Sequence, residues 1–204
     1  MKRLLAMALL VVTAALSLPV TASASSTTNW QLANGSVKAS PGLATFNFTA
    51  TNKARLLYSN KQGGNIFGST MTASYTIGGL SAPAVFTYAG ENTPSNPCGT
   101  PATVRLFFQT GGKFAYTNYW WADVTPGSAV LASGSDSLSA LVDPTLTAWS
   151  DWNGQPSSAN ASEFEAAARN ATVVGLSYGG GCFFENGVGT SDGSGHFTLD
   201  AFTK

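Results

Sequence analysis

Thr70-Met71-Thr72-Ala73-Ser74-Tyr75-Thr76-Ile77 alternates hydroxyl-bearing and apolar side chains without a break. Successive side chains of a β-strand point to opposite faces, so this stretch predicts a strand with one buried and one wetter face. The same two-residue period recurs over 43–49, 104–108 and 197–201. Further candidate strands lie at 54–58, 84–88, 114–124, 137–142, 172–178 and 182–185. The chain is therefore expected to be mainly β.

Turn-forming residues separate these candidate strands, as in Gly78-Gly79, Gly111-Gly112 and Asp192-Gly193. Many short strands with regular breaks predict a β-sandwich of jelly-roll type. One short helix is expected over 163–170, where Phe164, Ala167 and Ala168 form an apolar stripe. Ser162 and Glu165 have the spacing of a capping box at its start. We expect this helix to close one end of the sandwich.

The N-terminus has the organisation of a secretory signal peptide. Met1-Lys2-Arg3 precede an apolar run over 4–18, and Pro19 is followed by Ala22-Ser23-Ala24. A basic start, an apolar run of this length and a small-x-small site are what signal peptidase recognises. The run is too short to cross a bilayer. We expect cleavage after Ala24, which leaves 25–204 as a single secreted domain, extracellular or periplasmic, with no membrane insertion.

The charge balance limits the partners that this domain would bind. Removal of Lys2 and Arg3 lowers the basic residues from 10 to 8 against 10 acidic ones, a net charge of −2. Nucleic acids and anionic membranes select for clustered lysine and arginine, so neither is expected as a partner. Low charge combined with many aromatic residues also argues against disorder.

Cys98 and Cys182 are the only two cysteines. An even number of cysteines in an exported protein predicts a disulfide bond. The alternative, a metal site, needs further cysteine or histidine ligands at short spacing, and the chain contains only His196.

Three segments of the C-terminal half resemble a known family. They are 149–155 (WSDWNGQ), 164–177 (FEAAARNATVVGLS) and 195–202 (GHFTLDAF). Together they resemble the closing part of laminin-B-like, galactose-binding-type jelly-roll modules of bacterial secreted proteins. Ala201 stands where such modules usually have asparagine after Leu-Asp. The resemblance implies the jelly-roll fold but not a ligand, because this fold hosts many functions.

Gly175-Leu176-Ser177-Tyr178-Gly179 matches the G-x-S-x-G pattern of serine hydrolases, and Asp192 and His196 follow in the order of a catalytic triad. The pattern is functional where a strand turns sharply into a helix. Here Gly180-Gly181 and another strand-like run follow instead. A plain turn at the strand end is therefore favoured for Ser177, and a solvent-facing position beside buried Phe197 for His196.

The acidic residues support catalysis weakly. Sugar hydrolysis needs two carboxyl groups about 5 to 9.5 Å apart, whereas Glu163 and Glu165 lie on the expected helix and Glu185 on a separate run. Asp192 is expected to cap its own turn. The alternative is a structural calcium ion held by Asp192 and Asp200 with backbone carbonyls. No other cofactor is expected.

The tryptophans are the best indication of a binding surface. Neighbouring strand residues face opposite ways, so Trp120 and Trp121 are not expected to share one core. Trp149 and Trp152 lie close to the polar side chains of Asn153 and Gln155. Flat rings beside amides suit a sugar, whose apolar face stacks while its hydroxyl groups form hydrogen bonds. The competing interpretation is that both tryptophan pairs belong to the core.

The sequence thus favours a secreted, non-catalytic β-sandwich module that binds a glycan or cell-envelope polysaccharide. The residues expected to carry binding are Trp120, Trp121, Trp149, Trp152, Asn153 and Gln155. Two alternatives stay open: a small secreted serine hydrolase that uses Ser177 and His196, and a purely structural envelope protein.

Overall fold

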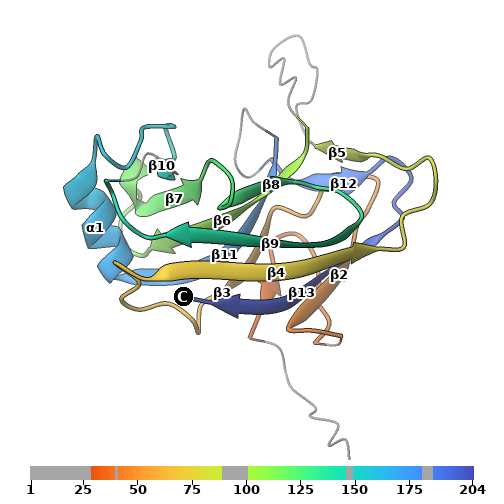
Figure 1. The fold of residues 1–204 in the computed structure, drawn as a ribbon, viewed down its shortest axis with the longest axis horizontal. Helices are drawn as coiled ribbons and strands as arrows, with labels where there is room; N and C mark the ends of the chain where they lie inside the picture. Colours follow the sequence, from red (N-terminus) through yellow and green to blue (C-terminus); the bar gives the residue numbers. More distant parts are fainter. Residues whose placement is uncertain (1–28, 40, 89–100, 146–148, 181–185) are drawn as a thin grey trace, which may run out of the picture.

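The computed structural model describes residues 29–39, 41–88, 101–145, 149–180 and 186–204. The chain is mainly β, with antiparallel sheets packed together and one helix (Figure 1). The β-sandwich expectation is confirmed, whereas the jelly-roll order of connections stays a prediction. Among the described residues no helix is long and apolar enough to cross a membrane.

The larger sheet is built on the two long strands β6 (Thr103–Thr110) and β11 (Ala171–Gly179), which pair along almost their whole length. The order across this sheet is β1 (Gln31–Leu32), β3 (Leu56–Ser59), β11, β6, β7 (Tyr119–Ala122) and β10 (Trp149–Asp151), and β8 (Ser128–Val130) also pairs with β6.

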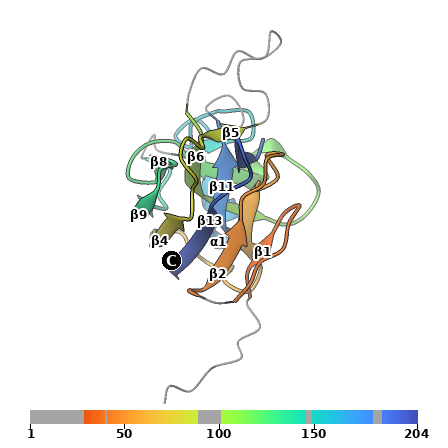
Figure 2. The same ribbon diagram turned by 90° about the vertical axis from the view of Figure 1, so that its right-hand side faces the viewer.

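The smaller sheet packs against the larger one. Its order is β2 (Ala44–Asn47), β13 (His196–Thr203), β4 (Thr70–Gly78) and β9 (Gly134–Leu141), and a separate pair consists of β5 (Phe86–Tyr88) and β12 (Val188–Thr190). Figure 2 shows the edge strands β1 and β2 side by side along one long side of the sandwich.

The two-residue period decides which face of each strand is buried. In β4 the apolar residues Met71, Tyr75 and Ile77 are buried and the hydroxyl residues between them are partly exposed. Hydroxyl groups pair across the outer face of this sheet, for example Thr76 with Ser135. When the two sheets pack together, the apolar rows on their facing sides are removed from water. These rows form one continuous core.

Helix α1 (Ala161–Arg169) closes one end of the sandwich, as expected (Figure 1). Its Phe164 ring packs between Trp120 and Phe108, at centroid distances of 4.9 and 5.4 Å. The predicted capping box is wrong, because the helix begins after Asn160 and Ser162 already lies in its first turn. The Ser162 hydroxyl donates to the neighbouring Glu163 carboxylate instead.

Most predicted strands are present, with ends shifted by a few residues. The segment 114–124 differs: it begins with an exposed loop and the short 3-10 helix η1 (Tyr116–Asn118), and only then enters β7. The short strands β1, β8, β10 and β12 were not predicted from the sequence. The expected signal peptide, both cysteines and the candidate strand 182–185 lie outside the described residues.

Candidate functional site

The candidate site begins at β10, where the chain passes from the core to the surface. Trp149 is fully buried, and its indole N–H donates to the Leu141 carbonyl at 2.8 Å. Asp151, at the end of the strand, is also buried. The chain then turns outward, and Trp152 lies on the surface with 42% of its area exposed.

Asp151 organises the turn that carries Trp152. One oxygen of its carboxylate accepts the backbone N–H groups of Asn153 and Gln155, both at 2.9 Å. The other oxygen accepts the side-chain amide of Asn160, the residue that precedes α1, at 3.2 Å. Charge-assisted hydrogen bonds of this kind are stronger than neutral ones. The turn is therefore held at both of its ends and tied to the start of the helix.

A second exposed segment, 113–119, lies beside this turn. The backbone N–H of Trp152 donates to the Tyr116 carbonyl at 3.3 Å, which joins the two segments. The Trp120 indole N–H donates to the Thr117 carbonyl at 2.8 Å, and the Asn118 side chain donates to the Lys113 carbonyl at 2.9 Å. The Trp120 hydrogen bond therefore ties the segment to the core, and the Asn118 hydrogen bond links the two ends of its loop.

Four rings from these two segments form what we call the aromatic surface: Phe114, Tyr116, Tyr119 and Trp152. Phe114 and Tyr116 are 57% and 49% exposed. The Phe114 ring contacts the rings of Tyr116, Tyr119 and Trp152 at centroid distances of 5.5, 5.8 and 6.1 Å. The ring centroids of Tyr119 and Trp152 are 5.1 Å apart. A contiguous set of exposed rings is unusual on a monomer surface and marks a site of interaction.

The surface rests on a buried ring. Trp121 is fully buried and lies 5.7 Å from Trp152 and 6.2 Å from Tyr119, with which it stacks. It does not belong to the core cluster between the sheets, whereas its neighbour Trp120 does. The expectation that Trp120 and Trp121 point to opposite faces of one strand is met, although neither is exposed.

Of the six residues expected to bind a ligand, three lie at the surface: Trp152, Asn153 and Gln155. Trp120 and Trp149 have no exposed area because they fill the core under α1, and Trp121 supports the surface from below. These three are therefore corrected from ligand contacts to packing residues.

Sequence reasoning missed Phe114, Tyr116 and Tyr119. All three were assigned to one long strand, whereas Phe114 and Tyr116 lie in an exposed loop and its short helix, and Tyr119 begins β7. The signal was present in Gly111-Gly112, which ends β6 and begins a loop in which apolar rings have no core to enter.

Ser177 and His196, the residues of the hydrolase alternative, lie in different sheets. Ser177 is inside β11, opposite Arg105 of β6, and is not at a strand-to-helix turn. His196 begins β13 in the smaller sheet, where its ring lies against Gly78 and Gly79. Each alternates with core residues of its own sheet, so the two side chains face opposite outer surfaces of the sandwich.

Arg105 is the cross-strand neighbour of Ser177 in β6. Its guanidinium forms an ion pair with Asp123 at 3.2 Å. Burial lowers the pKa of Arg105 and raises the pKa of Asp123, because both charges lose contact with water. The pair is a partly buried structural contact on the outer side of the larger sheet.

Asp192 and Asp200, the residues of the calcium alternative, make separate contacts. Asp192 caps the turn before β13 by accepting the Ser194 backbone N–H at 2.9 Å. Hydrogen bonds from the side chain and the backbone of Ser194 lower the pKa of Asp192. Asp200 lies within β13 and accepts the Thr76 hydroxyl at 2.8 Å. Within the described ranges no three histidine, cysteine or acidic side chains cluster in a way that suits a metal ion. Asp192 therefore caps its own turn, which was the first expectation for this residue.

Comparisons of this chain with protein families, with curated proteins and with solved structures found no match. The resemblance to galactose-binding-type jelly rolls therefore stays a prediction.

Proposed function

We propose that this chain is an exported, non-catalytic module that binds a glycan through the aromatic surface. The observation that carries the proposal is the contiguous exposure of Phe114, Tyr116 and Trp152 on segments that hydrogen bonds hold in place. A protein that only had to fold would gain stability by burying such rings, since each can remove a large apolar area from water.

The chemistry of the surface suits a saccharide. Aromatic faces carry a negative quadrupole and attract the weakly positive C–H groups on the apolar side of a pyranose ring. The amides of Asn153 and Gln155 are exposed beside Trp152 and offer donors and acceptors for sugar hydroxyls. The mature chain carries little net charge, so binding would rest on stacking and hydrogen bonds rather than on long-range attraction.

Rigidity supports the proposal further. Asp151 fixes the turn of Trp152, and Trp120 fixes the segment of Phe114 and Tyr116. Ordering a loop on binding costs free energy, and a surface that is already ordered avoids that cost. The arrangement is therefore preorganised for a flat ligand.

The test is a glycan array probed with the secreted chain, followed by calorimetric titration with the best oligosaccharide. Trp152→Ala and Phe114→Ala should each weaken binding about fivefold to a hundredfold, the range expected for loss of an aromatic anchor. Val85→Ala is the matched control, because Val85 is an exposed apolar residue outside the aromatic surface. It should leave the affinity unchanged.

Two results would overturn the proposal. One is the absence of binding to any glycan on the array. The other is self-association of the chain in sedimentation that Trp152→Ala abolishes, because the rings would then form a contact between copies. Export is tested separately by N-terminal sequencing of the protein from the culture medium, which should begin at Ser25.

A further inference from the structure

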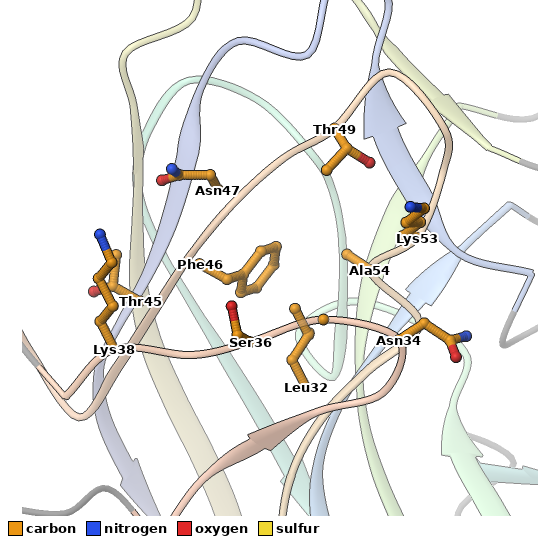
Figure 3. Close-up of a pocket in the computed structure, with 11 residues that line it drawn as sticks. Leu32, Asn34, Ser36, Lys38, Thr45, Phe46, Asn47, Thr49, Lys53 and Ala54 are labelled. Carbon is orange, nitrogen blue, oxygen red and sulfur yellow. The ribbon is translucent and has the colours of Figure 1, made fainter.

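A pocket of about 340 Å³ is lined by residues of β1, β2 and the loops beside them (Figure 3). Figure 2 shows these two edge strands side by side. The apolar lining of the pocket comes from Leu32, Phe46 and Ala54. Figure 3 shows the Phe46 ring between Lys38 on one side and Lys53 on the other. The volume lies at the lower end of the range typical of small-molecule sites, about 300–1,000 Å³. The pocket therefore suits a small ligand rather than a protein segment.

The polar side chains around this pocket have few partners inside the protein. Lys38 and Lys53 are exposed and form no ion pair with any described residue. The side-chain amides of Asn34 and Asn47 likewise have no hydrogen-bond partner within the described ranges. Two ammonium groups and two amides are thus free to bind a ligand.

The backbone of β2 adds a further pair of groups. The N–H and C=O of Thr45 both bond to Lys38, at 2.9 and 2.8 Å, on the side away from β13. In an antiparallel strand the bonding direction repeats every second residue, so the N–H and C=O of Asn47 point the same way. Lys38 pairs with Thr45 only, and no described residue forms a backbone pair with Asn47 on that side of β2. The pocket wall thus offers a backbone donor and acceptor at a free sheet edge.

The charged residues that line this pocket, Lys38 and Lys53, have one sign. Residues 29–88 contain Lys38, Lys53, Arg55 and Lys61 and no aspartate or glutamate. The whole chain is neutral by comparison, with 10 basic and 10 acidic residues. Because a pocket wall excludes water from part of the space around its charges, the field of two unpaired lysines is stronger there than on a flat surface. The pocket therefore favours an anion.

We propose that this pocket binds an acidic sugar unit, a pyranose that carries a carboxylate. The carboxylate would lie between Lys38 and Lys53, the hydroxyl groups would bond to Asn34, Asn47 and the free backbone edge, and the C–H face would lie on the apolar lining. The pocket shares no residue with the aromatic surface, and Figure 1 places β2 and β10 towards opposite ends of the sandwich. It is a second, independent site.

The probe is digalacturonic acid, titrated into ¹⁵N-labelled protein and followed by amide chemical shifts. The shifts should concentrate at Ser36 and Asn47, and the indole resonance of Trp152 should not move. Lys38→Gln and Lys53→Gln should each weaken binding about tenfold, as expected for loss of a charge-assisted hydrogen bond. Lys61→Gln is the matched control, because it removes the same charge from the same acid-free segment but does not line the pocket.

Each remaining outcome has a defined meaning. Equal weakening by Lys61→Gln would show attraction to diffuse basic charge and would overturn the proposal. Equal affinity for inorganic phosphate would show an anion site without sugar recognition. Equal affinity for neutral galactobiose would show that the lysines play no part in binding. Each of these two results would overturn the proposal. Trp152→Ala should leave digalacturonate binding unchanged, so failure of the aromatic surface as a glycan site would not affect this result.

Discussion

The ring of Trp152 lies 5.7 Å from the ring of Trp121, so a partly exposed tryptophan rests on a fully buried one. Trp121 belongs to β7 and Trp152 follows β10, and the pairing of β10 with β7 brings the two rings together. Trp121 therefore gives Trp152 a rigid support from below, while the Asp151 turn holds it from the side. Because Trp152 is supported by Trp121 but is not enclosed, its contribution to binding can be measured separately from its contribution to stability.

Replacement of Trp152 by alanine should weaken glycan binding and cost about 1 kcal/mol of unfolding free energy, since its ring is only partly buried and loses contacts at the surface. Trp149→Ala is the contrasting variant. Its ring is fully buried against Phe108 and Phe164, so the free energy of unfolding should fall by about 3–5 kcal/mol. Calorimetric titration and urea unfolding of both variants measure the two effects. A loss of several kcal/mol in Trp152→Ala would place that ring in the core and contradict its role as a ligand platform.

Asp151 should act on the aromatic surface as a positioning residue. Asp151→Ala removes the acceptor for the N–H groups of Asn153 and Gln155 and should lower the free energy of unfolding by about 2–3 kcal/mol. It should also weaken glycan binding, because the Trp152 turn loses its preferred conformation. Asp151→Asn keeps one carbonyl acceptor and should recover part of both losses. If Asp151→Ala destabilised the protein but bound glycan as tightly as the parent, the turn would not need to be preorganised.

The strands are predicted well where the alternation of apolar and polar residues extends over many residues. β4 contains several alternating pairs, and its buried row agrees with the prediction. In β13 the prediction holds for Phe197 and Leu199 but is wrong for Ala201, because a β-bulge between Leu199 and Ala201 leaves Ala201 exposed and buries Phe202 instead. β8, β10 and β12 contain three residues each, which is too short for any period to be visible. Their pairing depends on the neighbouring strands that long-range contacts bring beside them, and such contacts leave no local signature.

The candidate site could be predicted only in part, for the same reason. The predicted binding group around Trp152, Asn153 and Gln155 lies at the surface, whereas Trp149, which was grouped with it, is buried. Phe114 and Tyr116 come from a loop that is distant in sequence and that meets the turn only because β7 pairs with β10. The basic pocket has a sequence signal, the absence of acidic residues over 29–88, but its walls come together only at the edge between the sheets.

Cys98 and Cys182 should form a disulfide bond. The described residues that flank them are neighbours: Tyr88 pairs with Val188, and Thr103 pairs with Gly179. A denatured sample should therefore contain no titratable thiol before reduction and two afterwards. Reduction should lower the unfolding free energy by about 4–5 kcal/mol on the chain-entropy estimate for a closed loop of 84 residues. Two thiols in the unreduced, freshly purified protein would contradict this pairing.

Ester hydrolysis should be absent, because Ser177 and His196 face opposite outer surfaces of different sheets. Turnover of p-nitrophenyl acetate by the purified chain should not exceed the rate with heat-denatured protein. Ser177→Ala should leave that background rate unchanged. A rate above background that Ser177→Ala abolishes, with unchanged circular dichroism, would require another base beside Ser177 and would contradict the assignment.

Two buried tyrosines should make the protein sensitive to high pH. The rings of Tyr75 and Tyr178 lie 5.0 and 5.3 Å from the ring of Phe197, in the core. Burial raises the pKa of both phenols above the ordinary value of 10.0, and the Asp136 carboxylate, which accepts the Tyr75 hydroxyl, raises the pKa of Tyr75 further. The folded state thus keeps these protons at a pH at which the unfolded chain releases them.

The sign of the pH effect follows from this difference. Above pH 10 the folded protein binds more protons than the unfolded chain, so the unfolding free energy should fall with rising pH, by about 1.4 kcal/mol per pH unit for each tyrosine. Tyr178→Phe should halve the slope. It should also be neutral or stabilising at pH 7, because the Tyr178 hydroxyl is buried with no hydrogen-bond partner among the described residues. Tyr116→Phe, at an exposed position, should leave the slope unchanged. Urea unfolding at pH 9, 10 and 11 measures all three, and an equal slope in Tyr178→Phe and the parent protein would mean that the Tyr178 phenol ionises as easily in the folded chain as in the unfolded one.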